Sequence, residues 1–267
     1  VAVTWTNTGT VATVDLHYST DDFATETPLS VWEDGVGWVD AINFNNTNTA
    51  TWRIPDDISH TVKVRVKDYL DDDAYDISGE LRIKGDITIT APILHEPPEE
   101  NDPPWKIGQS YDITWGWIGT IDDVKVTYAT KDGYFAGTVD VAKDSQIITG
   151  TGTFWLANIS AGDEIGIGST GPPSITKWYE IASVDTNTQI TLTTYYKESD
   201  ATGQSYCIAE WKPVEGDGVM SNTGAYPWTI PDEASPNAGV RIADVRAEEI
   251  QDVMAVSEKF HIIGYVK

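Results

Sequence analysis

The sequence predicts an all-β protein made of tandem β-sandwiches, the second of which is interrupted by a small inserted β domain. Three observations predict this architecture. Short segments alternate apolar and polar residues, as in Val62 to Lys67, so that one face is buried and the other is solvated. Turn dipeptides such as Asp34-Gly35 and Asp132-Gly133 separate these segments at short intervals. One pattern of aromatic residues also occurs twice, and its second copy is longer than its first.

The repeated pattern begins with a tryptophan and a tyrosine at a fixed spacing. Trp5 and Tyr18 are 13 positions apart, and so are Trp115 and Tyr128. In both copies a glycine stands four positions after the tryptophan. Because internal repetition is typical of arrays of similar domains, the pattern favours an array protein over an enzyme with a single site.

The two copies resume at segments 52–56 and 228–232, which read Trp-Arg-Ile-Pro-Asp and Trp-Thr-Ile-Pro-Asp. From the preceding tyrosine to this tryptophan, the first copy takes 34 positions and the second takes 100. The difference of 66 positions indicates an insertion in the second copy. We therefore look for a separate β module between the two halves of that copy.

These spacings predict three domains. We expect one sandwich in residues 1–85, a second in residues 86–137 plus 210–267, and the inserted β domain in residues 138–209. The first copy has no counterpart of residues 86–108, so we expect that its first edge strand is missing and that its sheet edge is unpaired. The chain has no initiator Met and no visible signal peptide, which predicts a mature fragment of a longer protein.

Individual strands are expected where apolar and polar residues alternate and where Thr and Val are dense, because both residues favour pleated structure. In chain order the clearest segments are 62–67, 80–84, 87–90, 139–141, 161–167, 178–182 and 189–193. Residues 243–255 form the one helix-like run, but Val and Ile interrupt it, so we expect two strands joined by an acidic bend. Residues 92–104 form an acidic, proline-rich loop that we expect to help set the angle between the sandwiches.

The composition excludes several classes of partner. The net charge is −25, from 17 basic and 42 acidic residues. Nucleic acids and anionic membrane surfaces require clustered Lys and Arg, so neither is an expected partner. No apolar stretch approaches the ~18 residues of a membrane span, so no membrane insertion is expected. The single cysteine, Cys207, lies in an apolar run and is expected to be a buried, inert thiol.

The sequence does not predict an enzyme. The four histidines are scattered and none has a metal-ligand spacing such as His-Glu-x-x-His. No Gly-x-Ser-x-Gly elbow is present, and the Gly-Thr-Gly-Thr run at 150–153 lacks the Lys-Ser ending of a phosphate-binding loop. No pair among the 42 acidic residues stands out as a glycosidase pair. We expect no catalytic residue and no organic cofactor.

Calcium is the one cofactor for which the sequence offers candidate ligands. Five carboxylates fall within nine positions, and they belong to Asp68, Asp71, Asp72, Asp73 and Asp76. Calcium takes 6–8 oxygen ligands, and loop carboxylates commonly supply them. The spacing does not fit an EF-hand, which needs Gly at position 6 and Glu at position 12. The alternative is a solvated hairpin turn, since Asp is also a preferred turn residue.

Exposed aromatic rings are a second candidate feature, because such rings can stack on sugars. The candidate rings lie outside the repeated positions and belong to Trp32, Trp38, Trp155, Trp178, Tyr195 and Tyr196. The alternative is that they fill the cores of the sandwiches and the insert, because aromatic side chains contribute much of the burial energy. A cell-surface glycan is therefore an expected partner only if some of these rings are exposed.

The repeated pattern also resembles a known family. Residues 105–262 follow the order Trp-x-Ile-Gly-x-Ser, Ile-Thr-Trp, Tyr-Ala-Thr-x-Asp-Gly, Trp-Thr-Ile-Pro-Asp and Val-Arg-Ile, and residues 3–83 follow a similar order. This order resembles the immunoglobulin-like repeats of large prokaryotic secreted and surface-layer proteins. It is also similar to the Ser/Thr-rich modules of fungal cell-wall proteins. The inserted segment resembles a small β module of phage-tail and other fibrous extracellular proteins, in residues 148–155, 161–163 and 181–192.

The resemblance implies a structural, non-catalytic segment of a large secreted cell-surface protein that contributes to a lattice or array. The implied location is extracellular, and the implied partners are copies of the chain or neighbouring domains of its parent. The matched Trp, Gly and Pro positions are structural ones, so the family brings no catalytic residue. Three alternatives stay open: a glycan-binding adhesin module, a phage-tail or fibre component, and an accessory fragment of a hydrolase whose catalytic domain lies elsewhere in the parent. A specific partner is expected on residues 138–209 before either repeat.

Overall fold

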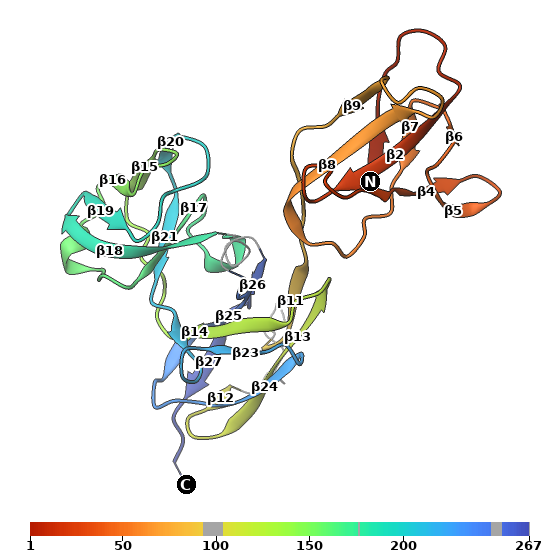
Figure 1. The fold of residues 1–267 in the computed structure, drawn as a ribbon. Coiled ribbons are helices and arrows are strands. Elements are labelled where there is room, and N and C mark those ends of the chain that lie inside the picture. Colours follow the sequence, from red (N-terminus) through yellow and green to blue (C-terminus); the bar gives the residue numbers. More distant parts are fainter. Residues whose placement is uncertain (93–103, 176, 247–252, 267) are drawn as a thin grey trace. The chain divides into compact units, whose positions relative to one another are not determined.

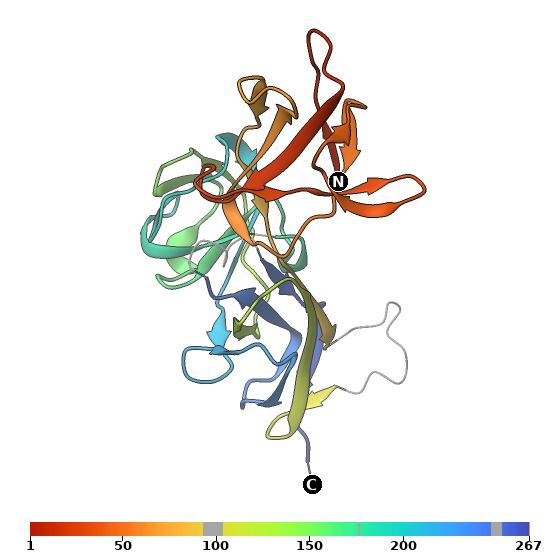
Figure 2. The same ribbon diagram turned by 45° about the vertical axis from the view of Figure 1, so that its right-hand side comes forward.

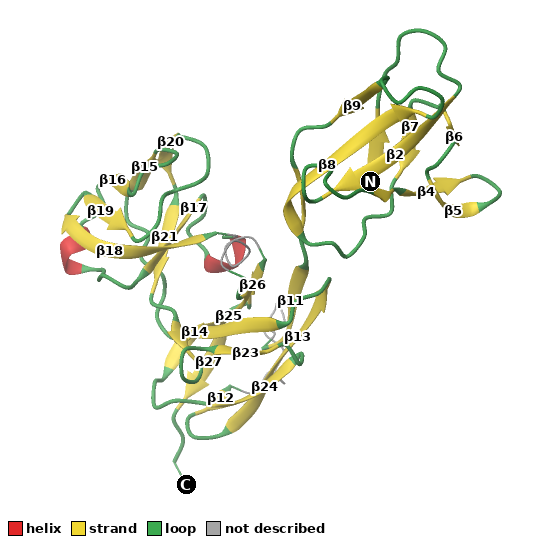
Figure 3. Cartoon of the chain, in the orientation of Figure 1, coloured by secondary structure: helices red, strands yellow, loops and turns green. Residues whose placement is uncertain are grey.

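The computed structural model describes residues 1–92, 104–175, 177–246 and 253–266. The chain divides into two compact units, Val1–Gly85 and Asp86–Lys267. Almost all regular structure is strand (Figure 3). Among the described residues the helices are two 3₁₀ turns, η1 (Trp155–Ala157) and η2 (Pro172–Ser174). The predicted all-β class is confirmed.

The first unit is built from short strands. Their bounds are β1 (Ala2–Thr4), β2 (Thr13–Ser19), β3 (Thr27–Pro28), β4 (Ser30–Glu33), β5 (Gly37–Asp40), β6 (Phe44–Asn45), β7 (Thr49–Thr51), β8 (Ser59–Asp68), β9 (Tyr75–Ile77) and β10 (Leu81–Ile83). One sheet has the order β10-β8-β2-β3, with β6 paired to β2 and β9 paired to β8. β1 pairs with β7, and β4 pairs with β5 in a hairpin (Figure 1).

The core of the first unit lies between the long sheet and the shorter strand pairs. Leu16 and Val62 of the long sheet are fully buried, as is Val31 of β4. The ring of Tyr18 packs against that of Trp52 with centroids 5.5 Å apart. Apolar residues on β2 and β8 alternate with charged ones such as Arg65, so their side chains reach the core from one face.

The second unit contains the remaining strands. Their bounds are β11 (Asp86–Ala91), β12 (Trp105–Lys106), β13 (Ser110–Ile118), β14 (Asp123–Ala129), β15 (Thr138–Val141), β16 (Ile147–Thr151), β17 (Glu164–Ile167), β18 (Trp178–Thr186), β19 (Gln189–Leu192), β20 (Ala201–Gln204), β21 (Tyr206–Ala209), β22 (Lys212–Pro213), β23 (Val219–Ser221), β24 (Ala225–Thr229), β25 (Ser235–Asp244), β26 (Met254–Val256) and β27 (Phe260–Ile263).

Two of the sheets in this unit share one core in a sandwich-like arrangement. The smaller sheet has the order β11-β13-β24, and the larger has the order β12-β27-β25-β14-β22, with β23 on β14 and β26 on β25. Ile113 and Trp228 face the core from the smaller sheet, and Val126 and Ile242 face it from the larger one. The rings of Tyr128 and Trp228 pack with centroids 4.8 Å apart.

Residues 138–209 supply a third sheet whose seven strands are all their own. Its order is β20-β15-β16-β19-β18-β17-β21 (Figure 1). A separate core fills it, centred on Trp155, which is fully buried and donates its indole N–H to the Tyr206 hydroxyl at 3.1 Å. Tyr206 in turn donates to the Ala136 carbonyl at 2.5 Å, so the polar ends of both buried rings have partners.

Two sequence expectations involve residues that are only partly described. In segment 243–255, β25 ends at Asp244 and pairs antiparallel with β26, but the expected acidic bend at 247–252 lies outside the described residues. Most of the proline-rich loop, residues 93–103, also lies outside them. The expectation that this loop helps set the angle between the sandwiches therefore stays a prediction.

Candidate functional site

The acidic segment predicted as a calcium site forms the turn between β8 and β9. Asp68 accepts the backbone N–H of Leu70 at 2.9 Å through Oδ1. Asp71 accepts the backbone N–H of Asp73 at 3.0 Å in the same way. These are the local bonds by which Asp side chains stabilise turns.

The remaining carboxylates of this turn have other partners. Lys67 donates to Asp72 at 2.7 Å, and this hydrogen bond holds the pKa of Asp72 below its usual range. Asp76 accepts the backbone N–H of Ile77 at 2.9 Å. Among the residues that the structure describes, no group of three or more His, Cys, Asp or Glu is arranged to hold a metal ion. The five aspartates thus share a turn without converging, and calcium remains a prediction of the sequence.

The histidines and the cysteine do not come together. His17 lies in β2, His60 in β8 and His261 in β27, and His95 lies outside the described residues. Cys207 in β21 is fully buried, as expected, and burial raises the pKa of its thiol to about 11. A thiol in this environment is not a nucleophile, because the thiolate is the reactive form.

The six aromatic residues considered for sugar binding divide evenly between core and surface. Three are buried: Trp155, Trp178 and Tyr196. Three are exposed: Trp32, Trp38 and Tyr195. Of the four candidate rings in residues 138–209, only that of Tyr195 is therefore exposed to a ligand.

Trp32 and Trp38 form an exposed aromatic pair. They lie opposite each other across the β4–β5 hairpin, with ring centroids 5.5 Å apart and planes at 74°. The two residues remain 47% and 43% exposed, and Trp32 donates its indole N–H to Asp34 at 3.0 Å. The hairpin projects from the body of the first unit in both views (Figures 1 and 2). Its two rings are thus available to a flat, apolar ligand face.

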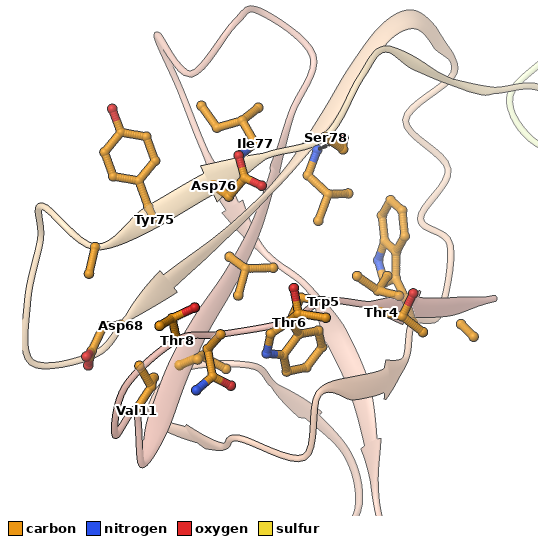
Figure 4. A pocket seen from close by; sticks show the side chains of 18 of the residues that line it. Thr4, Trp5, Thr6, Thr8, Val11, Asp68, Tyr75, Asp76, Ile77 and Ser78 are labelled. Carbon is orange, nitrogen blue, oxygen red and sulfur yellow. Dashed lines mark hydrogen bonds between the residues drawn. The ribbon is translucent and has the colours of Figure 1, made fainter.

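A groove of about 820 Å³ opens on the other side of the same unit. Figure 4 shows Thr4, Trp5, Thr6 and Thr8 along one wall and β9 with Ser78 along the other. The floor is apolar and contains Val14, Trp52, Val64 and Val66. We call this cavity the open groove. The sequence indicates this groove only indirectly, because the first copy is expected to lack an edge strand that the second copy has.

Nothing in the sequence predicts the polar contact between the third sheet and the larger sheet of the second unit. The Arg241 guanidinium in β25 donates to both oxygens of Glu164 in β17, at 2.6 and 2.7 Å. Its Nε donates to the Thr127 hydroxyl at 3.2 Å, and its Cζ lies 4.7 Å from the centre of the Trp211 ring. The Arg241 side chain is only 7% exposed. A bidentate pair of this kind is a strong and directional contact.

An apolar cluster surrounds the same contact. The rings of Trp178 and Trp211 meet edge to face with centroids 5.6 Å apart. Ile175 and Cys207 are buried beside them, and Met254 of β26 packs against the cluster. The bidentate Arg241–Glu164 pair and this apolar cluster together attach the third sheet to the larger sheet of the second unit.

Comparison with known proteins adds little to this picture. No known protein family and no curated protein matches the sequence. Among solved structures, the chain has a weak likeness to a phage phi92 endosialidase, with 14% identity and a TM-score of 0.21. The match covers 88% of this chain and 37% of that one. Among the described residues no helix is long and apolar enough to span a membrane. A TM-score this low does not establish a common fold, so the function is argued from the geometry of this chain.

Proposed function

We propose that the chain is a non-catalytic structural segment of a large secreted cell-surface protein, built from tandem immunoglobulin-like sandwiches with an inserted β domain in the second. The observation that carries this proposal is the contact of Arg241 with Glu164. An array protein must hold its lateral domains at defined angles. The bidentate fork and the packed Trp178 and Trp211 rings supply that constraint.

The residues common to the two copies also support a scaffold. The aligned aromatic residues Tyr18 and Trp52 pack as a core pair, as do Tyr128 and Trp228. Repeated core positions specify a fold rather than a chemistry. The repeats thus define the spacing of the array, and the inserted domain provides a lateral contact between copies.

The proposal includes calcium binding at the turn between β8 and β9. Four of its five aspartates, Asp71 to Asp73 and Asp76, are exposed, so they repel one another in a strongly acidic chain. A bound calcium ion would relieve that repulsion and supply a bridge between copies. In this form the lattice would assemble with calcium and dissociate with a chelator.

The test is assembly of the purified chain, followed by electron microscopy with calcium and with EGTA. Ordered sheets that form only with calcium, and that an Asp71→Asn/Asp73→Asn variant fails to form, would support the proposal. An Asp217→Asn variant, altered in a different exposed turn, is the matched control and should assemble normally. A chain that stays monomeric at all calcium concentrations, or that turns over a substrate, would contradict it.

A second candidate function is glycan binding, which the exposed pair Trp32 and Trp38 favours. Aromatic rings that remain exposed on a projecting hairpin offer a surface for the apolar face of a sugar ring. A glycan array tests it. Specific binding that is lost in Trp38→Ala but kept in Tyr195→Ala, an exposed aromatic elsewhere, would favour an adhesin over a lattice component.

A further inference from the structure

The open groove has a filled counterpart in the second unit. β1 pairs with β7 so that Val3 lies opposite Ala50. The equivalent strands β13 and β24 have the same register, with Ile113 opposite Tyr226. Residues 1–5 therefore correspond to 111–115, and the two sandwiches can be compared residue by residue.

The other edge of these strands differs between the units. In the second unit β11 pairs antiparallel with residues 114–118, and Ile89 lies opposite Trp115. The corresponding residues of the first unit are 4–8. Within residues 1–92, all of which the structure describes, β1 pairs with β7 alone. The outer edge of β1 at Thr4 thus has no paired strand, and it continues into residues 5–8, which form no strand and lie along one wall of the open groove (Figure 4).

The core is more deeply buried in the unit that has β11 than in the unit that lacks such a strand. In the second unit Ile87 is buried, and Ile89 packs against the same core. Four neighbouring core residues are also buried there: Ile113, Trp115, Ile121 and Ile242. Their counterparts in the first unit are only half-buried and line the open groove: Val3, Trp5, Val11 and Val66. The first unit therefore exposes the apolar surface that β11 covers in the second.

We propose that the open groove is an acceptor site for a β-strand supplied by a polypeptide segment that does not belong to a second copy of this chain. The strand runs antiparallel to residues 4–8 and places β-branched apolar side chains at alternating positions, as Ile87 and Ile89 do in β11. Main-chain hydrogen bonds provide affinity in this mode of recognition, and alternate side chains in pockets provide specificity. β11 itself is paired with β13, so the occupant is a separate segment.

The backbone at the free edge is oriented to receive this strand. The Trp5 N–H is directed toward β7, where it donates to the Asn48 carbonyl at 3.2 Å. Successive N–H groups of a strand point to opposite sides, so Thr4 of β1 directs its N–H toward the groove. Thr6 lies beyond β1 and corresponds to Gly116, which stands opposite Thr88 of β11. The N–H groups of Thr4 and Thr6 are the ones that an added strand would use.

The charged residues of the groove indicate which side chains the added strand should carry. The charged side chains among its lining residues, all of which the structure describes, are Asp68 and Asp76. At the position of Asp76 the second unit has Ala255, which packs against the core beside β11. A strand with alternating β-branched residues and one Lys or Arg facing Asp76 therefore complements this groove. This inference holds whether or not the chain forms a lattice.

The test uses the full chain and a synthetic peptide with the sequence of residues 85–92, Gly-Asp-Ile-Thr-Ile-Thr-Ala-Pro. Titration is followed by calorimetry. We expect saturable binding, and at least tenfold weaker binding of a peptide in which both Ile residues are replaced by Ser. Asp76→Ala, which reproduces Ala255, should tighten binding of the apolar peptide by several-fold.

Thr6→Pro removes one N–H at the free edge and should abolish binding, whereas Thr6→Ala keeps the N–H and should bind normally. Unchanged circular dichroism of both variants shows that the sandwich is still folded. The proposal is overturned if the peptide does not bind at millimolar concentration, or if Thr6→Pro binds it as well as Thr6→Ala. A dimer of the chain that Thr6→Pro dissociates would also overturn it, since the occupant would then be a second copy.

Discussion

Trp115 donates its indole N–H to Oδ1 of Asn222 at 2.8 Å, a residue 107 positions further along the chain. Trp5 makes the same bond to Asn46 at 2.8 Å, over 41 positions. The two separations differ by 66 positions, which is the length of the interruption between the copies in the sequence. The bond ties the start of each copy to its second half, and the inserted residues leave it unchanged.

Replacing either asparagine tests how much this bond contributes. Asn222→Ala leaves the Trp115 N–H without its partner in a buried core, and we expect a loss of about 1–3 kcal/mol in the free energy of unfolding. Asn46→Ala should cost less, because Trp5 is half-exposed and water can replace the lost acceptor. Urea unfolding followed by circular dichroism measures both values. An equal or larger loss in Asn46→Ala would contradict this argument, and Thr223→Ala on an exposed turn serves as the control.

Gly133 should not tolerate a side chain. A Cβ at this position would overlap the Sγ of Cys207 and lie 3.2 Å from the Ile208 carbonyl oxygen. Gly133→Ala should therefore destabilise the second unit by about 1–3 kcal/mol, as overpacking does elsewhere. Gly239→Ala is the matched control, because nothing lies within 4 Å of its added Cβ.

The steric origin of that loss can be checked in a second background. Combining Gly133→Ala with Cys207→Ala removes the overlapping sulfur, so the double variant should lose less stability than the two single variants together. Thermal unfolding of the four proteins gives the coupling between the positions. If the losses simply add, Cys207 is not the obstacle.

The fork of Arg241 on Glu164 should behave as a buried ion pair. Glu164→Leu or Arg241→Met leaves one partner uncompensated, and we expect a loss of about 3 kcal/mol for each single variant. The double variant Arg241→Met/Glu164→Leu should lose less than either single variant, because no charge is then left buried. Denaturant unfolding of all four proteins supplies the cycle. Lys197→Met, which breaks the exposed pair with Asp144, should change stability by less than about 1 kcal/mol.

Much of the fold could be predicted because strands have a local signal. Alternation at Val62, Val64 and Val66 predicts β8. The repeated aromatic positions are predicted to be structural, and the structure packs them as the pairs Tyr18–Trp52 and Tyr128–Trp228. These features depend on side-chain periodicity and on spacing along the chain, and both are visible in one sequence.

The contacts between distant segments could not be predicted in the same way. Arg241 stands in the repeated Val-Arg-Ile pattern, but nothing in the sequence pairs it with Glu164, 77 positions away in the inserted segment. Likewise the aspartates between Asp68 and Asp76 are dense in sequence, whereas their carboxylates bond to nearby N–H groups and to Lys67. A high density of aspartates along the chain does not determine where their side chains point. The sequence alone therefore could not distinguish an acidic turn from a cation site.

Cys207 should make the stability of the second unit depend on alkaline pH. Burial raises the pKa of its thiol from 9.0 to about 11, so above pH 9 the unfolded chain releases a proton that the folded chain retains. The unfolded state then binds fewer protons, and the free energy of unfolding should fall by up to about 1.4 kcal/mol per pH unit until the folded thiol also ionises near pH 11. Cys207→Ala should lack this component of the decline, so the variant separates the contribution of the thiol from the ionisation of Tyr and Lys.

The burial of Cys207 should also protect its thiol from modification. At pH 8 the native thiol should not react with a disulfide reagent, whereas the guanidinium-unfolded chain should react with one equivalent. A native thiol that reacts at the unfolded rate would show that β21 opens in solution, and that Cys207 is accessible despite its place in the core.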